Sequence, residues 1–278
     1  MNRPLTIVGC FAHPDDETWV MSGSLAMLAA KGARCAVWTA TRGEAGEISE
    51  GTGVTRDRLG EVREAEEREA MEVLGVHEVE FGDFRDGAVP DADAGELVRQ
   101  LHDFLERTQP DVVVTMEPGG ITAHEDHMAV TAATTAAFAA YAETAEAAGR
   151  QPRLYHEGAP ASTLRRWREV ARSSGVEFPG EDQPFAPRGT PDERFTCHVD
   201  TSSVAKLRGE ALRRHRTQLG IGPYTMLALR DDVIGEVLGE ESYIRVHPAP
   251  RQGDAPETSL VDAFSVGPGD GSTGSADA

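Results

Sequence analysis

The amino-acid sequence predicts an α/β fold, namely a Rossmann-like, mostly parallel sheet with helices on both faces. Through the first half of the chain, short apolar stretches alternate with longer segments of helical periodicity. This alternation is typical of βαβ units, whose parallel strands are covered by helices and are therefore apolar throughout. The length of 278 residues and the hydrophobic content of 39% allow one large domain with a substantial core.

The strands of the first half are expected where β-rich apolar runs stop at turn or loop residues. The helices between them follow from apolar residues at helical spacing, as at Met21, Leu25 and Leu28, and from a stop signal at Gly75. Strands are expected over residues 5–11, 33–41, 76–81, 111–116 and 153–156, and helices over 59–74, 94–106 and 126–148.

The second half of the chain is less regular. A proline-rich segment over residues 158–194, with a short helical piece near 164–173, indicates an insertion or lid packed on the main domain. The other elements expected here are strands over 195–199 and 243–246 and a helix over 201–219.

We expect a single domain over residues 1–250 and an acidic tail over 251–278. The tail is rich in Gly, Ser, Pro, Asp and Ala, a composition that buries too little apolar surface to fold by itself. It is therefore expected to be largely disordered, although residues 260–264 could dock locally.

Composition also limits the kinds of partner that the protein is expected to bind. The formal net charge of −20 argues against nucleic acid or an anionic membrane surface, because both attract basic patches. No apolar run approaches the roughly 18 residues of a membrane-spanning helix, and we expect no signal peptide before the first strand. Cys10, Cys35 and Cys197 show no paired spacing, which fits a reducing cytoplasm as the expected location. The sequence leaves open whether the protein forms a homo-oligomer.

Polar clusters follow the first four expected strands at their carboxyl ends. In a doubly wound sheet these ends share one edge, and ligands bind there. We therefore expect the clusters to converge, which makes each of them more significant than it is alone. The clusters are His13-Pro14-Asp15-Asp16-Glu17, 41–47, 82–87 and 117–127.

Two interpretations compete for the first cluster, which places an imidazole and three carboxylates within five residues. In one, Asp15 or Asp16 caps the following helix. In the other, His13 and Asp16 bind a metal, and Asp15 acts as general base on a water beside it. A catalytic zinc takes three protein ligands and keeps one position open, so the second interpretation needs a ligand from elsewhere. Glu17 receives no metal-binding or catalytic role and is expected to support the loop.

The fourth cluster can supply that ligand. His124 and His127 are three residues apart at the expected start of a helix, so they share one face. One can bind the metal while the other faces the substrate. The alternative is a pair of surface histidines, which the helix dipole disfavours when they are charged. Asp126, beside both, can orient an imidazole and is counted with the catalytic group.

The second cluster is open to two interpretations. Gly43 and Gly46 permit a tight loop with exposed N–H groups, but no nucleotide-binding glycine pattern is present. Glu44 is either a hydrogen-bonding contact to a polyol or amide or part of a solvated acidic turn. By its position on a helix, Arg63 is expected to be solvated and paired with glutamates of that helix.

Six motifs stand in order along the chain: His13-Pro14-Asp15-Asp16-Glu17; Thr41-Arg42-Gly43-Glu44; Arg63 with Leu74-Gly75; Arg85-Asp86-Gly87; Gly120 with His124-Glu125-Asp126-His127; and His215-Arg216-Thr217-Gln218. Together they resemble the PIG-L/LmbE-like family of zinc-dependent de-N-acetylases. The resemblance covers about residues 5–157 and about 190–247, and the first and fifth motifs are its most specific parts. It departs at Glu125, where the family usually has proline, a residue that the first turn of a helix favours without requiring.

The resemblance implies a role for each matching residue. It also raises Arg63 above the solvated position expected from its helix alone. The implied zinc ligands are His13, Asp16 and His127; the general base is Asp15; the residue that stabilises the oxyanion or serves as acid is His124; and the contacts to sugar hydroxyls are Glu44, Arg63 and Asp86.

The expected function is a zinc-dependent N-deacetylase that removes an N-acetyl group from a small amino sugar or related glycoside, such as an N-acetylglucosaminyl compound. Two histidines and one carboxylate suit Zn²⁺, but they also suit Fe²⁺, Co²⁺ or Ni²⁺. One alternative is an amidase that cleaves a larger acyl amide, such as a thiol conjugate. Another is a non-catalytic Rossmann-like binding module, which would be expected to have lost a ligand or the base.

Overall fold

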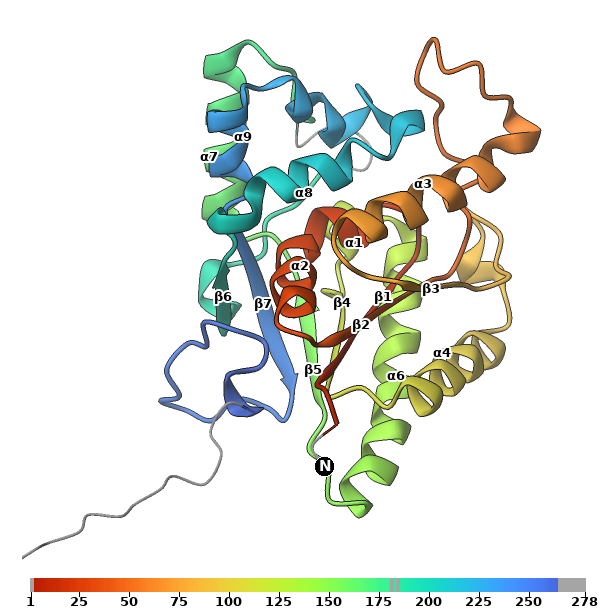
Figure 1. Cartoon of the computed structure of the whole chain (residues 1–278), viewed down its shortest axis with the longest axis vertical. Coiled ribbons are helices and arrows are strands. Elements are labelled where there is room, and N and C mark those ends of the chain that lie inside the picture. The colour runs from red at the N-terminus through yellow and green to blue at the C-terminus, as the bar shows by residue number, and fades with distance from the viewer. Residues whose placement is uncertain (1–2, 181–182, 184–185, 265–278) are drawn as a thin grey trace, which may run out of the picture.

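A seven-stranded sheet lies at the centre of the computed structural model, which describes residues 3–180, 183 and 186–264 (Figure 1). Every strand expected from the sequence is present within three residues at each end. The strands are β1 (Thr6–Phe11), β2 (Arg34–Thr39), β3 (Glu78–Phe81), β4 (Val112–Met116), β5 (Arg153–Glu157), β6 (Cys197–Asp200) and β7 (Glu240–His247).

The strand order across the sheet is β3-β2-β1-β4-β5-β7-β6. Strands β1 to β5 are parallel, and β7 runs antiparallel to both of its neighbours. The chain extends the sheet from β1 toward β3 on one side and from β4 toward β5 on the other. Ligands bind beyond the carboxyl ends of the strands at such a reversal, which here lies between β1 and β4. The expected α/β, mostly parallel fold is confirmed.

Helices cover both faces of this sheet (Figure 1). In the described part of the chain they are α1 (Asp16–Val20), α2 (Ser22–Ala30), α3 (Leu59–Val73), α4 (Ala94–Thr108), α5 (Gly120–Ala123), α6 (Glu125–Ala147), α7 (Ala161–Ser174), α8 (Ala205–Leu212) and α9 (Asp231–Val237). Helices α2 and α3 share one apolar core with the sheet, and α4 and α6 share the other.

Strand β1 contributes to both cores because successive side chains point to opposite faces. Ile7 and Phe11 belong to the core beneath α2 and α3, whereas Val8 and Cys10 belong to the core beneath α4 and α6. The chain therefore leaves β1 between two packed layers, which holds the first polar cluster in place. All three cysteines are buried and unpaired, as expected from their spacing.

The expected helix over 201–219 is wrong in its second half, because α8 ends at Leu212. The chain instead turns back, and a short 3₁₀ helix spans Arg216–Gln218. The cause is a buried carboxylate on α3: Glu66 accepts the backbone N–H of Thr217 at 3.0 Å and its hydroxyl at 2.7 Å. Thr217 therefore bonds to Glu66 and does not continue the backbone hydrogen bonds of α8. As a result, Gln218 lies at the rim of the sheet.

The expected insertion, residues 158–194, contributes α7. Figure 1 shows α7 and α9 beyond the end of the sheet toward which β1 runs. Leu229 and Ile234 join residues of α7 and α8 in a third apolar cluster there. Whether this layer moves as a lid stays a prediction.

Residues 251–264 differ from the disorder expected of the tail. Glu257 pairs with Cys197 in an isolated bridge and binds Arg245 at 2.7 Å, and Leu260 is buried. Charge pairing with arginines of the sheet, which composition does not reveal, orders this part. Residues 265–278 lie outside the described residues.

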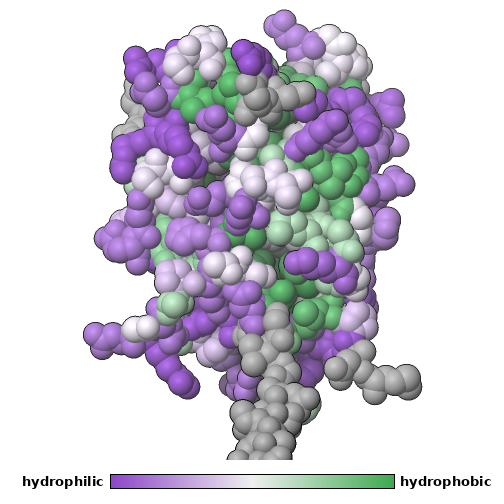
Figure 2. Space-filling model, turned by 60° about the vertical axis from the view of Figure 1, so that its left-hand side comes forward, coloured by the Kyte–Doolittle hydropathy of each residue, from purple (hydrophilic) through white to green (hydrophobic). Residues whose placement is uncertain are grey.

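Hydrophilic side chains cover most of the face in Figure 2, and apolar side chains form separate patches between them. Among the described residues, no helix combines the length and the apolar character needed to cross a membrane.

A buried ion pair joins the end of the chain to its beginning. Glu241 of β7 lies 3.2 Å from Arg208 of α8, and both side chains are at most 2% exposed. The Glu241 carboxylate also accepts the N–H groups of Gly23 at 2.7 Å and Ser24 at 2.9 Å. Since α2 has no side-chain cap of its own, Glu241 serves as its cap from across the molecule.

Replacing Glu241 with Gln should lower the free energy of unfolding by about 3–5 kcal/mol, because the buried Arg208 guanidinium loses its counter-charge. Chemical denaturation followed by circular dichroism measures this. Glu240→Gln is the matched control, since the Glu240 side chain is 40% exposed, and it should cost less than about 1 kcal/mol. Equal losses in the two variants would contradict the role given to the pair.

Candidate active site

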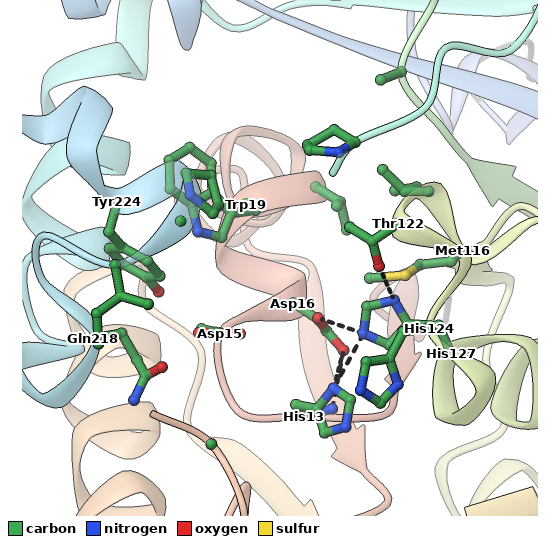
Figure 3. Close-up of a pocket in the computed structure, with 18 of the residues that line it drawn as sticks. His13, Asp15, Asp16, Trp19, Met116, Thr122, His124, His127, Gln218 and Tyr224 are labelled. Atoms are coloured by element: carbon green, nitrogen blue, oxygen red, sulfur yellow. Dashed lines mark hydrogen bonds and ion pairs between the residues drawn. The ribbon is translucent and has the colours of Figure 1, made fainter. Parts of the chain in front are cut away.

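A cavity of about 340 Å³ lies at the carboxyl ends of β1 and β4, where the chain order reverses. Seven of the nine predicted site residues line it, and Figure 3 shows several of them converging. Asp126 lies behind His13, and Glu44 lines a neighbouring hollow. The seven are His13, Asp15, Asp16, Arg63, Asp86, His124 and His127.

His13, Asp16 and His127 meet on one side of this cavity. His13 Nδ1 lies 3.0 Å from His127 Nε2, and Asp16 Oδ1 lies 3.3 Å from the same nitrogen. Asp16 Oδ2 is 3.7 Å from His13 Nδ1 and accepts the backbone N–H groups of Ala12 and His13. Oδ2 is thus held by the backbone beside the His13 ring, and Oδ1 faces the His127 ring.

Hydrogen bonds assign the tautomer of both imidazoles. His13 Nε2 donates to Asp126 Oδ2 at 3.2 Å and lies 3.1 Å from Asp86 Oδ1. His127 Nδ1 donates to the carbonyl of Gly120 at 2.9 Å. With both rings neutral, these tautomers point the lone pairs of His13 Nδ1 and His127 Nε2 at each other, so the position between the two nitrogens fits either a shared proton or a bound cation. Burial lowers the pKa of His13, but bonds to Asp126 and Asp86 outweigh it and raise that pKa to about 10.

The spacing of these atoms fits a small tetrahedral metal. Metal–nitrogen distances of about 2.0–2.1 Å place two ligand atoms roughly 3.3 Å apart in a tetrahedron. Here His127 Nε2 lies 3.0 Å from His13 Nδ1 and 3.3 Å from Asp16 Oδ1, and the other Asp16 oxygen, Oδ2, lies 3.7 Å from His13 Nδ1. Partners behind each imidazole that orient it are also typical of metal sites. His124 is close enough to be an alternative ligand, since nitrogens of the three histidines lie within 4.8 Å of one another.

Asp15 lies between this group and the far wall of the cavity (Figure 3). Its φ of 109° is in the left-handed region, which costs free energy for any residue but glycine. Two contacts hold it there: its N–H donates to Glu67 Oε2 at 3.2 Å, and its carboxylate binds Arg63 at 3.2 Å. Burial raises the pKa of Asp15 to about 6, although the charge of Arg63 opposes that rise.

The expectation that Arg63 is solvated and paired within its own helix is wrong. It is 4% exposed and donates to the carbonyls of Pro14 at 2.7 Å and Gly43 at 3.0 Å as well as to Asp15. The two glycines of the second cluster make room for it, because a Cβ on Gly43 or Gly46 would approach its guanidinium to 2.4 or 2.6 Å. The absence of a side chain at Gly43 and Gly46 therefore leaves space for the Arg63 guanidinium. An anion-binding loop is not needed to explain the two glycines.

His124 caps helix α6 and faces the cavity. Its Nδ1 accepts the N–H of Asp126 at 3.2 Å, so the neutral ring carries its proton on Nε2. Burial lowers the pKa of His124, and the charges of His13 and His127 lower it further. The ring is therefore suited to donate a hydrogen bond while neutral.

The predicted sugar contacts occupy different positions. Arg63 and Asp86 line the cavity. Glu44 lines the neighbouring hollow, and its Oε1 accepts the N–H of Asp86 at 2.9 Å. Direct contact between Glu44 and a sugar stays a prediction, whereas the structure shows its hydrogen bond to the Asp86 backbone.

The sequence analysis did not single out most of the remaining wall. Glu157 is the last residue of β5 and lies at its carboxyl end, so the rule that identified the other clusters could have identified it. Tryptophan and leucine give no such signal, because they are also typical of cores. Residues of this wall are Trp19, Leu164, Trp167, Ile221, Pro223 and Tyr224.

Comparison with known proteins identifies the class of α/β enzymes to which this fold and this site belong. The family model described as GlcNAc-PI de-N-acetylase (PIG-L) matches residues 8–138, the part that runs from β1 into α6 and carries His13, Asp16 and His127. The chain belongs to this family, as the relatives described next also show.

Two curated relatives are 1D-myo-inositol 2-acetamido-2-deoxy-alpha-D-glucopyranoside deacetylases. That of Geodermatophilus obscurus is 32% identical over 265 residues, covering 84% of this chain and 88% of the relative. That of Thermobifida fusca is 32% identical over 278 residues, covering 90% and 96%. A solved structure, N,N'-diacetylchitobiose deacetylase from Pyrococcus horikoshii, has a TM-score of 0.59 at 20% identity, covering 88% of this chain and 86% of that one, and it shares the fold.

Asp126→Asn should weaken metal binding by roughly ten- to a hundred-fold, because the carboxylate that orients His13 loses its charge. Competition with a chromogenic chelator measures the affinity. Glu125→Gln removes a charge from the exposed neighbouring residue and should leave the affinity within about two-fold. Equal weakening in both variants would show that only the local charge matters.

Proposed function

We propose that this protein removes an N-acetyl group from an amino sugar or a related glycoside by metal-dependent hydrolysis. The observation that carries the proposal is the 3.0 Å approach of His13 Nδ1 to His127 Nε2, with Asp16 beside both imidazoles and Asp15 next to them on the cavity wall. Membership of the de-N-acetylase family and the names of the relatives support the reaction and the class of substrate.

His13, Asp16 and His127 would hold the metal, and Zn²⁺ is the ion we assign to them. When bound, such an ion supplies Lewis-acid chemistry, polarising a carbonyl and lowering the pKa of water. Asp126 and Asp86 keep the His13 ring in the tautomer that leaves Nδ1 available.

Asp15 is the general base of the proposed reaction. Its carboxylate takes the proton of the water that attacks the amide carbonyl, and Arg63 holds the carboxylate in place. A pKa raised by burial lets the same group keep that proton and then pass it to the leaving amine.

His124 stabilises the negative charge that develops on the amide oxygen. Its Nε2–H is available for this because Nδ1 accepts the N–H of Asp126. Arg63 and Asp86 border the same space, and the sugar hydroxyls are assigned to them. Glu44 supports Asp86 from behind.

The non-catalytic alternative is disfavoured by the residues themselves. A degenerate site would lack a ligand or the base, whereas His13, Asp15, Asp16 and His127 are all present and converge.

Release of free amine tests the reaction. With Zn²⁺ present, N-acetylated amino sugars and their glycosides should yield amine detectable with fluorescamine, and a chelator should abolish the release until Zn²⁺ is restored. Thiol conjugates with larger acyl groups belong in the panel. No release from any acetylated sugar, with metal content confirmed, would refute the proposed function.

Asp15→Asn should lower kcat by about 10²–10⁴-fold, because an amide cannot accept the proton, while metal content stays unchanged. Asp83→Asn is the matched control: its side chain is 87% exposed on the same rim, and this variant should retain activity. An Asp15→Asn enzyme with normal turnover and bound metal would show that another group is the base.

A further inference from the structure

The cavity has a polar half and an apolar half. His13, Asp16 and Asp86 lie in the polar half. Trp19 comes from α1 and Trp167 from α7, and Figure 3 shows Trp19 and Tyr224 across the space from His13 and His127. The apolar half is therefore built from segments far apart in the sequence and is continuous with the proposed metal site.

This apolar half is a formed surface. The rings of Trp19 and Tyr224 meet edge to face, with centroids 5.2 Å apart. Trp19 and Trp167 also pack against the third apolar cluster, and Leu164, which lines the same cavity, is buried. Side chains held this way need little reorganisation when a ligand binds.

Few hydrogen-bonding groups serve this part of the cavity. The side chains of Trp19, Leu164 and Trp167 offer no acceptor. The Gln218 amide donates to the carbonyl of Glu47 at 3.1 Å and to Thr217 at 3.1 Å. The indole N–H groups of Trp19 and Trp167 have no hydrogen-bond partner among the described residues. A polyol placed here would still find no acceptor on Trp19, Leu164 or Trp167 for its own hydroxyl protons, which disfavours it relative to an apolar group.

We propose that the amino sugar carries an apolar aglycone, aromatic or alkyl, that lies against Trp19, Leu164 and Trp167. This inference rests on the proposed function: the acyl group removed is acetyl, and its single methyl cannot fill the apolar half. The curated relatives are named for an inositol-linked substrate, so the proposal assigns this chain a different aglycone.

Substrate comparison tests the assignment. For the Zn²⁺-loaded full chain, kcat/KM for a phenyl or octyl glycoside of N-acetylglucosamine should exceed that for free N-acetylglucosamine by roughly ten- to a hundred-fold, the gain from burying such a group. It should exceed the value for the inositol glycoside by at least as much. Both anomers of each glycoside are assayed.

Variants connect the preference to the wall. Trp167→Ala should reduce the ratio of kcat/KM for the phenyl glycoside to that for free N-acetylglucosamine by about ten-fold or more, and Leu164→Ala should reduce it less. Arg166→Ala is the control, because Arg166 is exposed on the same helix and does not line the cavity. It should leave the ratio and the activity unchanged.

Binding gives a second measurement that does not depend on turnover. Two of the three tryptophans line the cavity. Titration of the Asp15→Asn variant with phenyl N-acetylglucosaminide should therefore change tryptophan fluorescence at a lower concentration than titration with the inositol glycoside does.

The outcomes separate the two proposals. Equal or better turnover of the inositol glycoside would overturn the apolar aglycone and leave the deacetylase function standing. Faster hydrolysis of N-hexanoylglucosamine than of N-acetylglucosamine, without a preference for aryl or alkyl glycosides, would also overturn it by assigning the apolar half to the acyl group. No turnover of any member of the panel would refute both proposals.

Discussion

The parallel pairing of β1 with β4 is the constraint on which the site depends. Ile7 pairs with Val112 and Gly9 with Val114, so both strands end at the same edge of the sheet. Two segments that are 114 residues apart then place their imidazole nitrogens 3.0 Å from each other. Apolar packing on both faces of the two strands sets this distance, and the polar residues beyond the strands only complete it.

The site also concentrates groups that are costly to bury. Arg63, Asp16 and Asp126 are nearly inaccessible, and Asp15 adopts a strained backbone conformation. The free-energy cost of burying each charge is offset by a specific partner. The Asp126 carboxylate, for example, accepts the N–H of Gly87 at 2.7 Å. Such a group of charges destabilises the apo protein relative to an apolar core, which is typical of a surface selected for chemistry.

The strands, the order of the clusters and their convergence could be predicted, because apolar runs and strand ends are local properties of the sequence. What could not be predicted depends on distant partners. The helix that ends at Leu212 stops because of Glu66 on another helix, and Arg63 is buried because two glycines leave it room. The apolar wall gave no signal either, since Trp19 looks like a core residue until α7 is placed beside it.

The capping of α2 by Glu241 has a consequence for the order of events in synthesis. The N–H groups in the first turn of that helix are capped by a residue made 217 or 218 positions later. Arg208, which binds the same carboxylate, also donates to the carbonyl of Trp19 at 2.9 Å. A nascent chain that ends before β7 thus has an uncapped α2 directly after α1, the helix that contributes Trp19 to the cavity wall. The amino-terminal half contains the proposed metal ligands, yet the last strand completes the structure that holds them.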